Sequence, residues 1–179
     1  MNKIRSICVY CGSSPGHDRM YVEAARTLGK AIAGARLRLV YGGGGKGIMG
    51  AVASSVSEAG GTVIGIIPRF LLTKEATEAA LARLDELVVT EDMHTRKHRM
   101  FEESDAFVAL PGGISTLEEI VEIMTWAQLG RHRKPIVLAN TGGFWSPLIK
   151  LLGHMKAEGF LHTAHRIAPL VIDDAAEIV

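Results

Sequence analysis

The chain has 179 residues, of which 47% are hydrophobic and 22% charged, and its net charge is +1. This length suits one domain with a sizeable core. The near-neutral charge argues against a general nucleic-acid-binding protein, which normally carries a basic excess. Apolar runs are too short to cross a bilayer, and the one that follows Lys3 and Arg5 ends at Cys11, too soon for a signal peptide. We therefore expect a cytoplasmic protein with no membrane or nucleic-acid partner.

Short apolar runs alternate with helix-forming segments along the chain. Strands are predicted at residues 4–10, 37–41, 62–67, 87–89, 106–110, 135–139 and 170–172. Helices are predicted at residues 20–33, 93–104, 116–129 and 146–158, and another follows the glycine run 42–50 and ends near residue 59. A further helix opens at 174, and residues 69–85 permit a helix or a mobile flap. Such alternation predicts an α/β fold, a Rossmann-like parallel sheet with helices on both faces, in a single domain spanning residues 1–179.

The stretch 110–122 combines a buried strand end, a glycine turn and a helix start. The turn at 111–113 leaves backbone N–H groups unpaired beside the positive end of a helix dipole, where anions such as phosphate bind. Glu118 and Glu119 follow in the first turn of this helix. Carboxylates so close to a phosphate would repel it, so we expect them to face a sugar or a developing cation.

A simpler interpretation of these two glutamates is helix capping. Ser115 with Glu118, and Thr116 with Glu119, both fit the Ser/Thr-x-x-Glu capping box, in which the glutamate satisfies backbone donors. Because a helix has one cap position, one carboxylate is left for another role, and Glu118 is the better candidate for the cap.

The glycine run at residues 42–50 fits the G-x-G-x-x-G pattern twice, between a predicted strand and a predicted helix, as a phosphate-binding loop requires. It is not a Walker A loop, because Ile48 stands where that motif has its lysine. An NAD site would need an acidic residue at the end of the next strand. Arg69 lies there instead, which leaves NADP open.

Residues 93–100 form a helix with basic residues on its inward face. Arg96 and Lys97 stand where helical spacing requires apolar residues. A buried cation needs an anionic partner, which a phosphate or the Glu118/Glu119 pair would supply. The alternative is that both side chains extend along a solvated face of the helix.

Metal and redox sites are weakly indicated. Cys8 and Cys11 have C-x-x-C spacing, but zinc would need further ligands, and Cys8 lies within a predicted buried strand. His94 and His98 lie one helical turn apart without the glutamate of an H-E-x-x-H motif. We expect no metal site. The remaining C-terminal histidines are expected at the surface: His154, His162 and His165.

Taken together, these motifs resemble the LOG family, the cytokinin riboside 5′-monophosphate phosphoribohydrolases that are often labelled lysine decarboxylases. The resemblance rests on the glycine run 42–50, on Met-His-x-Arg-Lys at 93–97 and on Pro-Gly-Gly-x-x-Thr-Leu-Glu-Glu at 111–119. It extends over nearly the whole chain. Ser115 replaces the third glycine of the family pattern P-G-G-x-G-T-x-E-E. This replacement is expected to change the affinity for phosphate.

The resemblance implies cleavage of a nucleoside 5′-monophosphate, a cytokinin riboside monophosphate or AMP, into free base and ribose 5-phosphate. It implies that Arg96 and Glu119 are catalytic: Glu119 stabilises the ribosyl cation or activates water, and Arg96 orients Glu119 and the substrate. The residues it implies in the substrate pocket are Gly43, Gly44, Glu75, Lys97, Gly112, Gly113, Ile114, Ser115, Thr116, Leu117, Glu118 and Thr125.

The same resemblance implies a homodimer and no cofactor, in particular no pyridoxal phosphate. Two other functions stay open at this point. One is a non-catalytic protein that binds or senses a nucleotide on the same fold. The other is an NADP-linked oxidoreductase, in which Arg69 would contact the cofactor.

Overall fold

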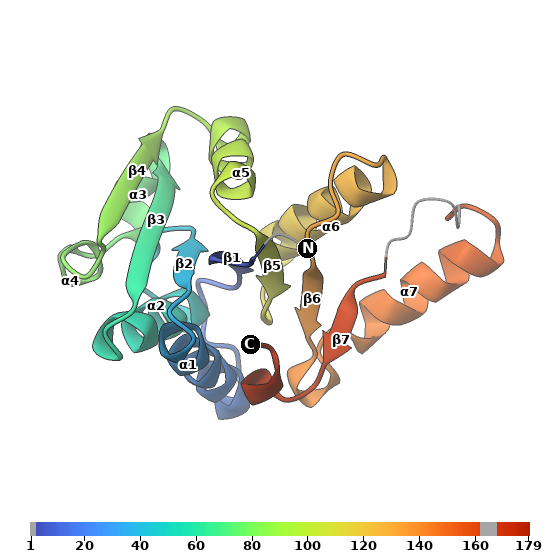
Figure 1. Ribbon diagram of the computed structural model, residues 1–179, viewed down its shortest axis with the longest axis horizontal. Coiled ribbons are helices and arrows are strands. Elements are labelled where there is room, and N and C mark those ends of the chain that lie inside the picture. Colours follow the sequence, from blue (N-terminus) through green and yellow to red (C-terminus); the bar gives the residue numbers. More distant parts are fainter. Residues whose placement is uncertain (1–2, 162–167) are drawn as a thin grey trace.

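The computed structural model describes residues 3–161 and 168–179 of the chain (Figure 1). Seven strands form one sheet in the order β4-β3-β2-β1-β5-β6-β7, and every neighbouring pair is parallel. The strands are β1 Ser6–Tyr10, β2 Arg38–Tyr41, β3 Thr62–Pro68, β4 Glu86–Thr90, β5 Ala106–Ala109, β6 Ile136–Ala139 and β7 Leu170–Ile172. The predicted Rossmann-like α/β fold is confirmed.

Helices cover both faces of the sheet (Figure 1). The main helices are α1 Arg19–Gly34, α2 Gly47–Glu58, α5 Met93–Glu102, α6 Ile114–Gln128 and α7 Ser146–Ala157. Helices α1 and α2 pack against one face, and α5, α6 and α7 contribute to the apolar cluster on the other. No helix in the described part of the chain is both long and apolar enough to span a membrane.

The central strands are buried on both faces, which explains their nearly continuous apolar sequences. In β1, Ile7 and Val9 point into one cluster, whereas Cys8 and Tyr10 point into the other. Cys8 and Cys11 are both buried free thiols in opposite clusters, and burial raises the pKa of each well above its ordinary value. The two cysteines form no disulfide with each other, and the prediction of a buried strand thiol at Cys8 is confirmed.

The order of the strands reverses between β1 and β5. After β1 the chain builds β2, β3 and β4 on one side, and after β5 it builds β6 and β7 on the other. The loops that follow these two central strands meet at the carboxyl edge of the sheet, where the Gly12 N–H donates to the Pro111 carbonyl at 3.1 Å. Ligands of open α/β sheets bind at such a switch point.

Several predicted boundaries differ from the observed ones. The ambiguous residues 69–85 contain two short helices, α3 Arg69–Glu75 and α4 Glu78–Leu81. The C-terminal helix is only the 3-10 turn η2 Ala175–Glu177, and another such turn, η1 Thr141–Gly143, precedes α7. His154 is exposed, as predicted. His162 and His165 lie outside the described residues.

Candidate active site

Arg96 is buried in α5, with only 6% of its surface exposed. The helix begins after Asp92, whose Oδ1 accepts from the Thr95 N–H at 2.7 Å, and this start directs Arg96 toward the sheet. Its Nη2 donates to the Gly42 carbonyl at 3.4 Å, and its Nη1 lies 3.7 Å from the Met93 sulfur. Within the described structure its Nε has no partner. The inward-facing interpretation is confirmed, and the guanidinium keeps donors available for an anion.

Glu119 is the buried carboxylate of α6, with 7% of its surface exposed. Burial raises its pKa to about 7, because the charged form loses hydration. The nearby positive charges of Arg96 and Lys97 oppose this shift, and the negative charges of Glu118 and Glu75 add to it. A carboxyl group with such a pKa exists in both protonation states near neutral pH, a property typical of catalytic acids and bases.

Arg96 of α5 and Glu119 of α6 line one cavity of about 80 Å³. Glu75, at the end of α3, lines the same cavity. The apolar part of the wall consists of Val9, Met49, Leu71, Met93 and Met100. The cavity thus presents two carboxyl groups and one guanidinium in a partly apolar, mostly buried space, where charges interact more strongly than in water.

A second cavity, of about 240 Å³, adjoins the first at the switch point of the sheet. Its wall includes the turn at Pro111, Gly112 and Gly113 and the aromatic rings of Tyr21 and Phe144. Two serines, Ser13 and Ser115, line both cavities. The two cavities are therefore neighbours, separated at these serines.

The helix that opens onto this second cavity has an uncapped N-terminus. Gly113 is the N-cap of α6 and makes no side-chain cap bond, so the N–H groups of the first turn remain available to an anion. The Thr116 hydroxyl is buried without a partner among the described residues. A Cβ at Gly112 would collide with Thr116, so only glycine allows this close approach.

The capping interpretation of the two glutamates is wrong. Helix α6 begins at Ile114, two residues earlier than predicted, so neither glutamate reaches its N-cap. Glu118 instead forms an ion pair with Lys97 at 2.5 Å, and Glu122 contacts the same ammonium at 3.2 Å. These two carboxylates raise the pKa of Lys97 despite partial burial. Lys97 thereby connects α5 to α6 through two ion pairs.

The glycine run after β2 packs closely against neighbouring elements, and some of its backbone N–H groups form hydrogen bonds. The Gly45 N–H donates to the Glu75 carbonyl at 3.0 Å, and the Met49 N–H at the start of α2 donates to the Gly12 carbonyl at 3.1 Å. Gly43 has φ +77° and lies against Ile67. The N-cap of α2, Lys46, makes no side-chain cap bond, so the binding role of Gly43 and Gly44 stays a prediction.

The remaining predicted pocket residues do not line either cavity. Ile114 is 81% exposed, and Leu117 packs against the core cluster beneath α6. The Thr125 hydroxyl donates to the Val121 carbonyl at 2.8 Å on the outer side of α6. Arg69, the residue that kept NADP open, forms an exposed ion pair with Glu91 at 3.5 Å.

Several residues that line these cavities were not among the predicted site residues, including Ser13, Gly42 and Met93. Ser13 follows a glycine at the end of the first strand, a position that the switch-point rule identifies once the strand order is known. Gly42 is recognised only through its contact with Arg96, and Met93 looked like an ordinary core residue.

Curated proteins of similar sequence share one activity. A cytokinin riboside 5′-monophosphate phosphoribohydrolase of Rhodococcoides fascians is 45% identical over 170 residues, covering 95% of this chain and 85% of the relative. The enzyme of the same name, LOG5, of Arabidopsis thaliana is 43% identical over 178 residues, covering 99% of this chain and 77% of the relative.

Solved structures share the fold. The molybdenum cofactor carrier protein of Chlamydomonas reinhardtii superposes with a TM-score of 0.71 at 25% identity, covering 97% of this chain and 92% of that one. The molybdenum cofactor binding protein of Rippkaea orientalis gives 0.69 at 20% identity, with coverages of 98% and 93%. The family model described as "possible lysine decarboxylase" matches residues 49–179. The chain therefore belongs to this family, the LOG family, in which its curated relatives are phosphoribohydrolases.

Proposed function

We propose that this protein hydrolyses the N-glycosidic bond of a nucleoside 5′-monophosphate, either a cytokinin riboside monophosphate or AMP, to free base and ribose 5-phosphate. The observation that carries the proposal is that Glu119 and Arg96 line one cavity, while a second cavity that shares Ser13 and Ser115 with it lies at the uncapped N-terminus of α6. The activity is the one named for the relatives.

The 5′-phosphate binds at the N-terminus of α6. Backbone N–H groups and the helix dipole attract the anion, and the buried Thr116 hydroxyl lies behind Gly112 at the same turn. An anchored phosphate places the ribose at the junction between the cavities, beside Ser13 and Ser115. Holding the sugar there lowers the entropic part of the barrier.

Glu119 acts on the sugar. Departure of the base builds positive charge on the ribose ring, and a carboxylate facing that charge stabilises the transition state. Water supplies the hydroxyl group at C1′, and the base leaves with a proton. Arg96 keeps Glu119 partly ionised through its positive charge and offers Nε and Nη donors to the substrate. Glu75, on the same wall, is the second carboxyl group available for a proton transfer.

The base occupies the apolar part of the first cavity, among Met49, Leu71 and Met93. Methionine side chains are flexible and adapt to ligands of different shape. This wall suits adenine with or without an apolar N6 substituent. The preferred base is determined by comparing kcat/KM for AMP with kcat/KM for isopentenyl-AMP.

We also propose that the protein is a cytoplasmic homodimer joined through α6. Ile114, Val121 and Leu129 form an exposed apolar stripe along the outer side of this helix, with exposed fractions of 81%, 40% and 73%. Thr125 lies on the same side, next to Val121. Pairing of two copies along this stripe would remove apolar surface from water.

The test of the function is incubation of the purified protein with AMP and with isopentenyl-AMP, followed by chromatographic separation of the products. We expect free base and ribose 5-phosphate, and a loss of about 10²–10³ in kcat when Glu119 is replaced by glutamine. Glu91→Gln is the matched control, because Glu91 is an exposed carboxylate whose partner is Arg69. Saturable nucleotide binding with no release of base would refute hydrolysis and favour a binding protein.

A further inference from the structure

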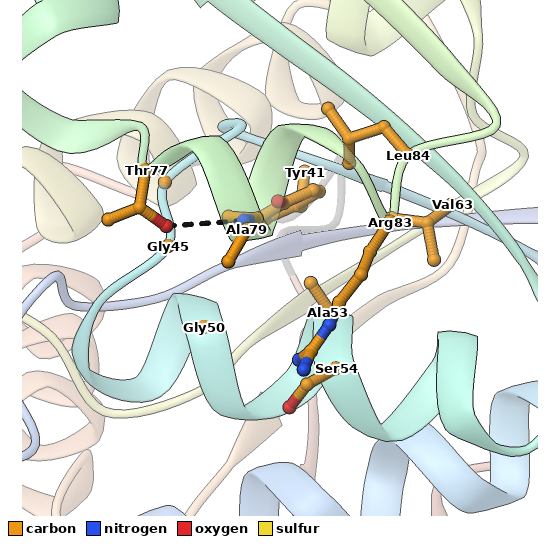
Figure 2. Close-up of a pocket in the computed structure, with 12 residues that line it drawn as sticks. Tyr41, Gly45, Gly50, Ala53, Ser54, Val63, Thr77, Ala79, Arg83 and Leu84 are labelled. Atoms are coloured by element: carbon orange, nitrogen blue, oxygen red, sulfur yellow. Dashed lines mark hydrogen bonds between the residues drawn. The ribbon is translucent and has the colours of Figure 1, made fainter.

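A third cavity, of about 110 Å³, lies on the other side of the glycine run, between α2 and α4 (Figure 2). It shares no lining residue with either cavity of the proposed active site. Its walls are Tyr41, Gly44, Gly45, Gly50, Ala53, Ser54, Val63, Thr77, Ala79, Ala80, Arg83 and Leu84. Only Gly44 among them belongs to the substrate pocket that the family resemblance implies.

The inner wall of this cavity carries an unsatisfied polar atom. Tyr41 is fully buried, and its hydroxyl has no partner in the described part of the chain. Figure 2 shows the ring extending beneath α4 toward Ala79, with the oxygen at that end. Burial raises the pKa of Tyr41, so the group stays protonated and offers an O–H donor. A buried hydroxyl without a partner costs free energy, which a bound ligand would recover.

Two other side chains offer donors around the same space. The Thr77 Oγ1 accepts from the Ala80 N–H at 3.2 Å, which leaves its own O–H free to donate. Arg83 extends across the cavity toward Ser54 in Figure 2, and its side chain is about half exposed. Its Nη1 is 3.7 Å from the exposed Glu58 carboxylate, a weak surface contact that a ligand can replace.

These features define the chemistry of a ligand. One guanidinium and two hydroxyl donors suit a single negative charge plus one further acceptor, whereas a dianion would be left uncompensated. The apolar side chains of Ala53, Val63 and Leu84 require a carbon skeleton. The volume is below the ~150 Å³ that holds a benzene ring, which limits the ligand to about six non-hydrogen atoms.

We propose that this cavity binds a small 2-oxo or 2-hydroxy monocarboxylate, with the carboxylate at Arg83 and Thr77 and the second oxygen at the Tyr41 hydroxyl. The ligand lies against Gly44 and Gly45. The Gly45 N–H donates a hydrogen bond to the Glu75 carbonyl at 3.0 Å. Three residues before Gly45, the Gly42 carbonyl accepts a hydrogen bond from Arg96. Binding of a ligand in the third cavity therefore affects the proposed active site through the glycine run. This coupling is the part of the inference that rests on the proposed function.

Isothermal titration calorimetry of the full chain with pyruvate and with lactate tests the binding. We expect saturable binding with Kd in the range of about 0.1–10 mM. Tyr41→Phe keeps the ring and removes only the hydroxyl, and Arg83→Gln removes the charge. Each should weaken binding about tenfold. Arg69→Gln, which alters another exposed arginine, should bind as the parent protein does. The heat of binding should also persist in Arg96→Gln, because the proposed ligand binds in the third cavity. A carboxylate bound by Arg96 would lie in the first cavity instead.

Absence of saturable heat with both probes would overturn the proposal, as would binding that is unchanged by Tyr41→Phe and Arg83→Gln. Because calorimetry needs no turnover, this result is independent of the proposed reaction. Coupling is tested by the KM for AMP with and without saturating pyruvate. We expect a change of about twofold or more in the parent protein and none in Tyr41→Phe. An unchanged KM in the parent would overturn the coupling.

Discussion

The carbonyl oxygen of Gly42 accepts a hydrogen bond from Nη2 of Arg96 at 3.4 Å, so the turn after β2 fixes a side chain of α5. A Cβ at position 42 would overlap the guanidinium of Arg96 and come within 3.3 Å of the Met49 sulfur. The glycine is therefore required by the close approach of a buried arginine. It links the glycine run to the proposed chemistry through Arg96.

Replacement of Gly42 by alanine should displace Arg96 while leaving the sheet intact. Because misplacement of a catalytic group by about 1 Å can cost 10²-fold, we expect kcat/KM to fall by about that factor. Steady-state kinetics with AMP, together with circular dichroism, measures the effect.

Gly34→Ala is the control for this substitution. Gly34 is the last residue of α1, and a Cβ there meets no atom within 4 Å. An active Gly42→Ala variant with normal kinetics would show that the position of Arg96 does not matter.

Glu119→Gln should stabilise the protein at pH 8. The pKa of the buried carboxyl is raised from 4.5 to about 7, so the folded state prefers the protonated form. The folded protein therefore loses stability as pH rises from about 4.5 through 7. At about 1.4 kcal/mol per pH unit, this loss amounts to about 3 kcal/mol, which the neutral amide avoids.

Urea unfolding at pH 4.5 and pH 8 separates this effect from a general change in packing. The free energy of unfolding of Glu119→Gln should exceed that of the parent at pH 8 and approach it at pH 4.5. Equal stabilities at pH 8 would mean that Glu119 is hydrated in solution.

The rate of base release should rise with pH through a midpoint near 7, because the ionised form of Glu119 stabilises the ribosyl cation. Lys97 lowers the pKa of Glu119 through its positive charge. Lys97→Gln should therefore move the midpoint of the pH–rate profile to higher pH. A midpoint that stays in place in this variant would assign the profile to another group, such as the substrate phosphate, which titrates near pH 6.

Val121→Glu should convert the proposed dimer into a monomer. Val121 lies at the middle of the exposed apolar stripe on α6, where a carboxylate from each copy would be buried in the pairing. Multi-angle light scattering measures the mass. The control is Val89→Glu, since Val89 is comparably exposed at 37% on the edge strand β4. A monomeric parent protein would refute the dimer directly.

Most of the fold was predictable from the sequence because its pattern is local. Strands buried on both faces require continuous apolar runs, and the helices between them end at glycines such as Gly60 and Gly159. Helical spacing also indicated an inward orientation of Arg96, but a solvated face stayed open until the structure showed the side chain buried. The start of α6 was misjudged because Gly113, a residue without a side chain to donate or accept, serves as its N-cap.

The amino-acid sequence by itself determined a parallel α/β sheet, the glycine turn before α6 and the family to which the chain belongs. Only the tertiary structure decided which glutamate is buried beside Arg96 and which is paired with Lys97. Adjacent residues of a helix point about 100° apart, so Glu118 and Glu119 differ in environment although their sequence context is nearly the same. The cavity at Tyr41 likewise depends on how α4 packs over the glycine run. This packing involves residues that are distant in the sequence.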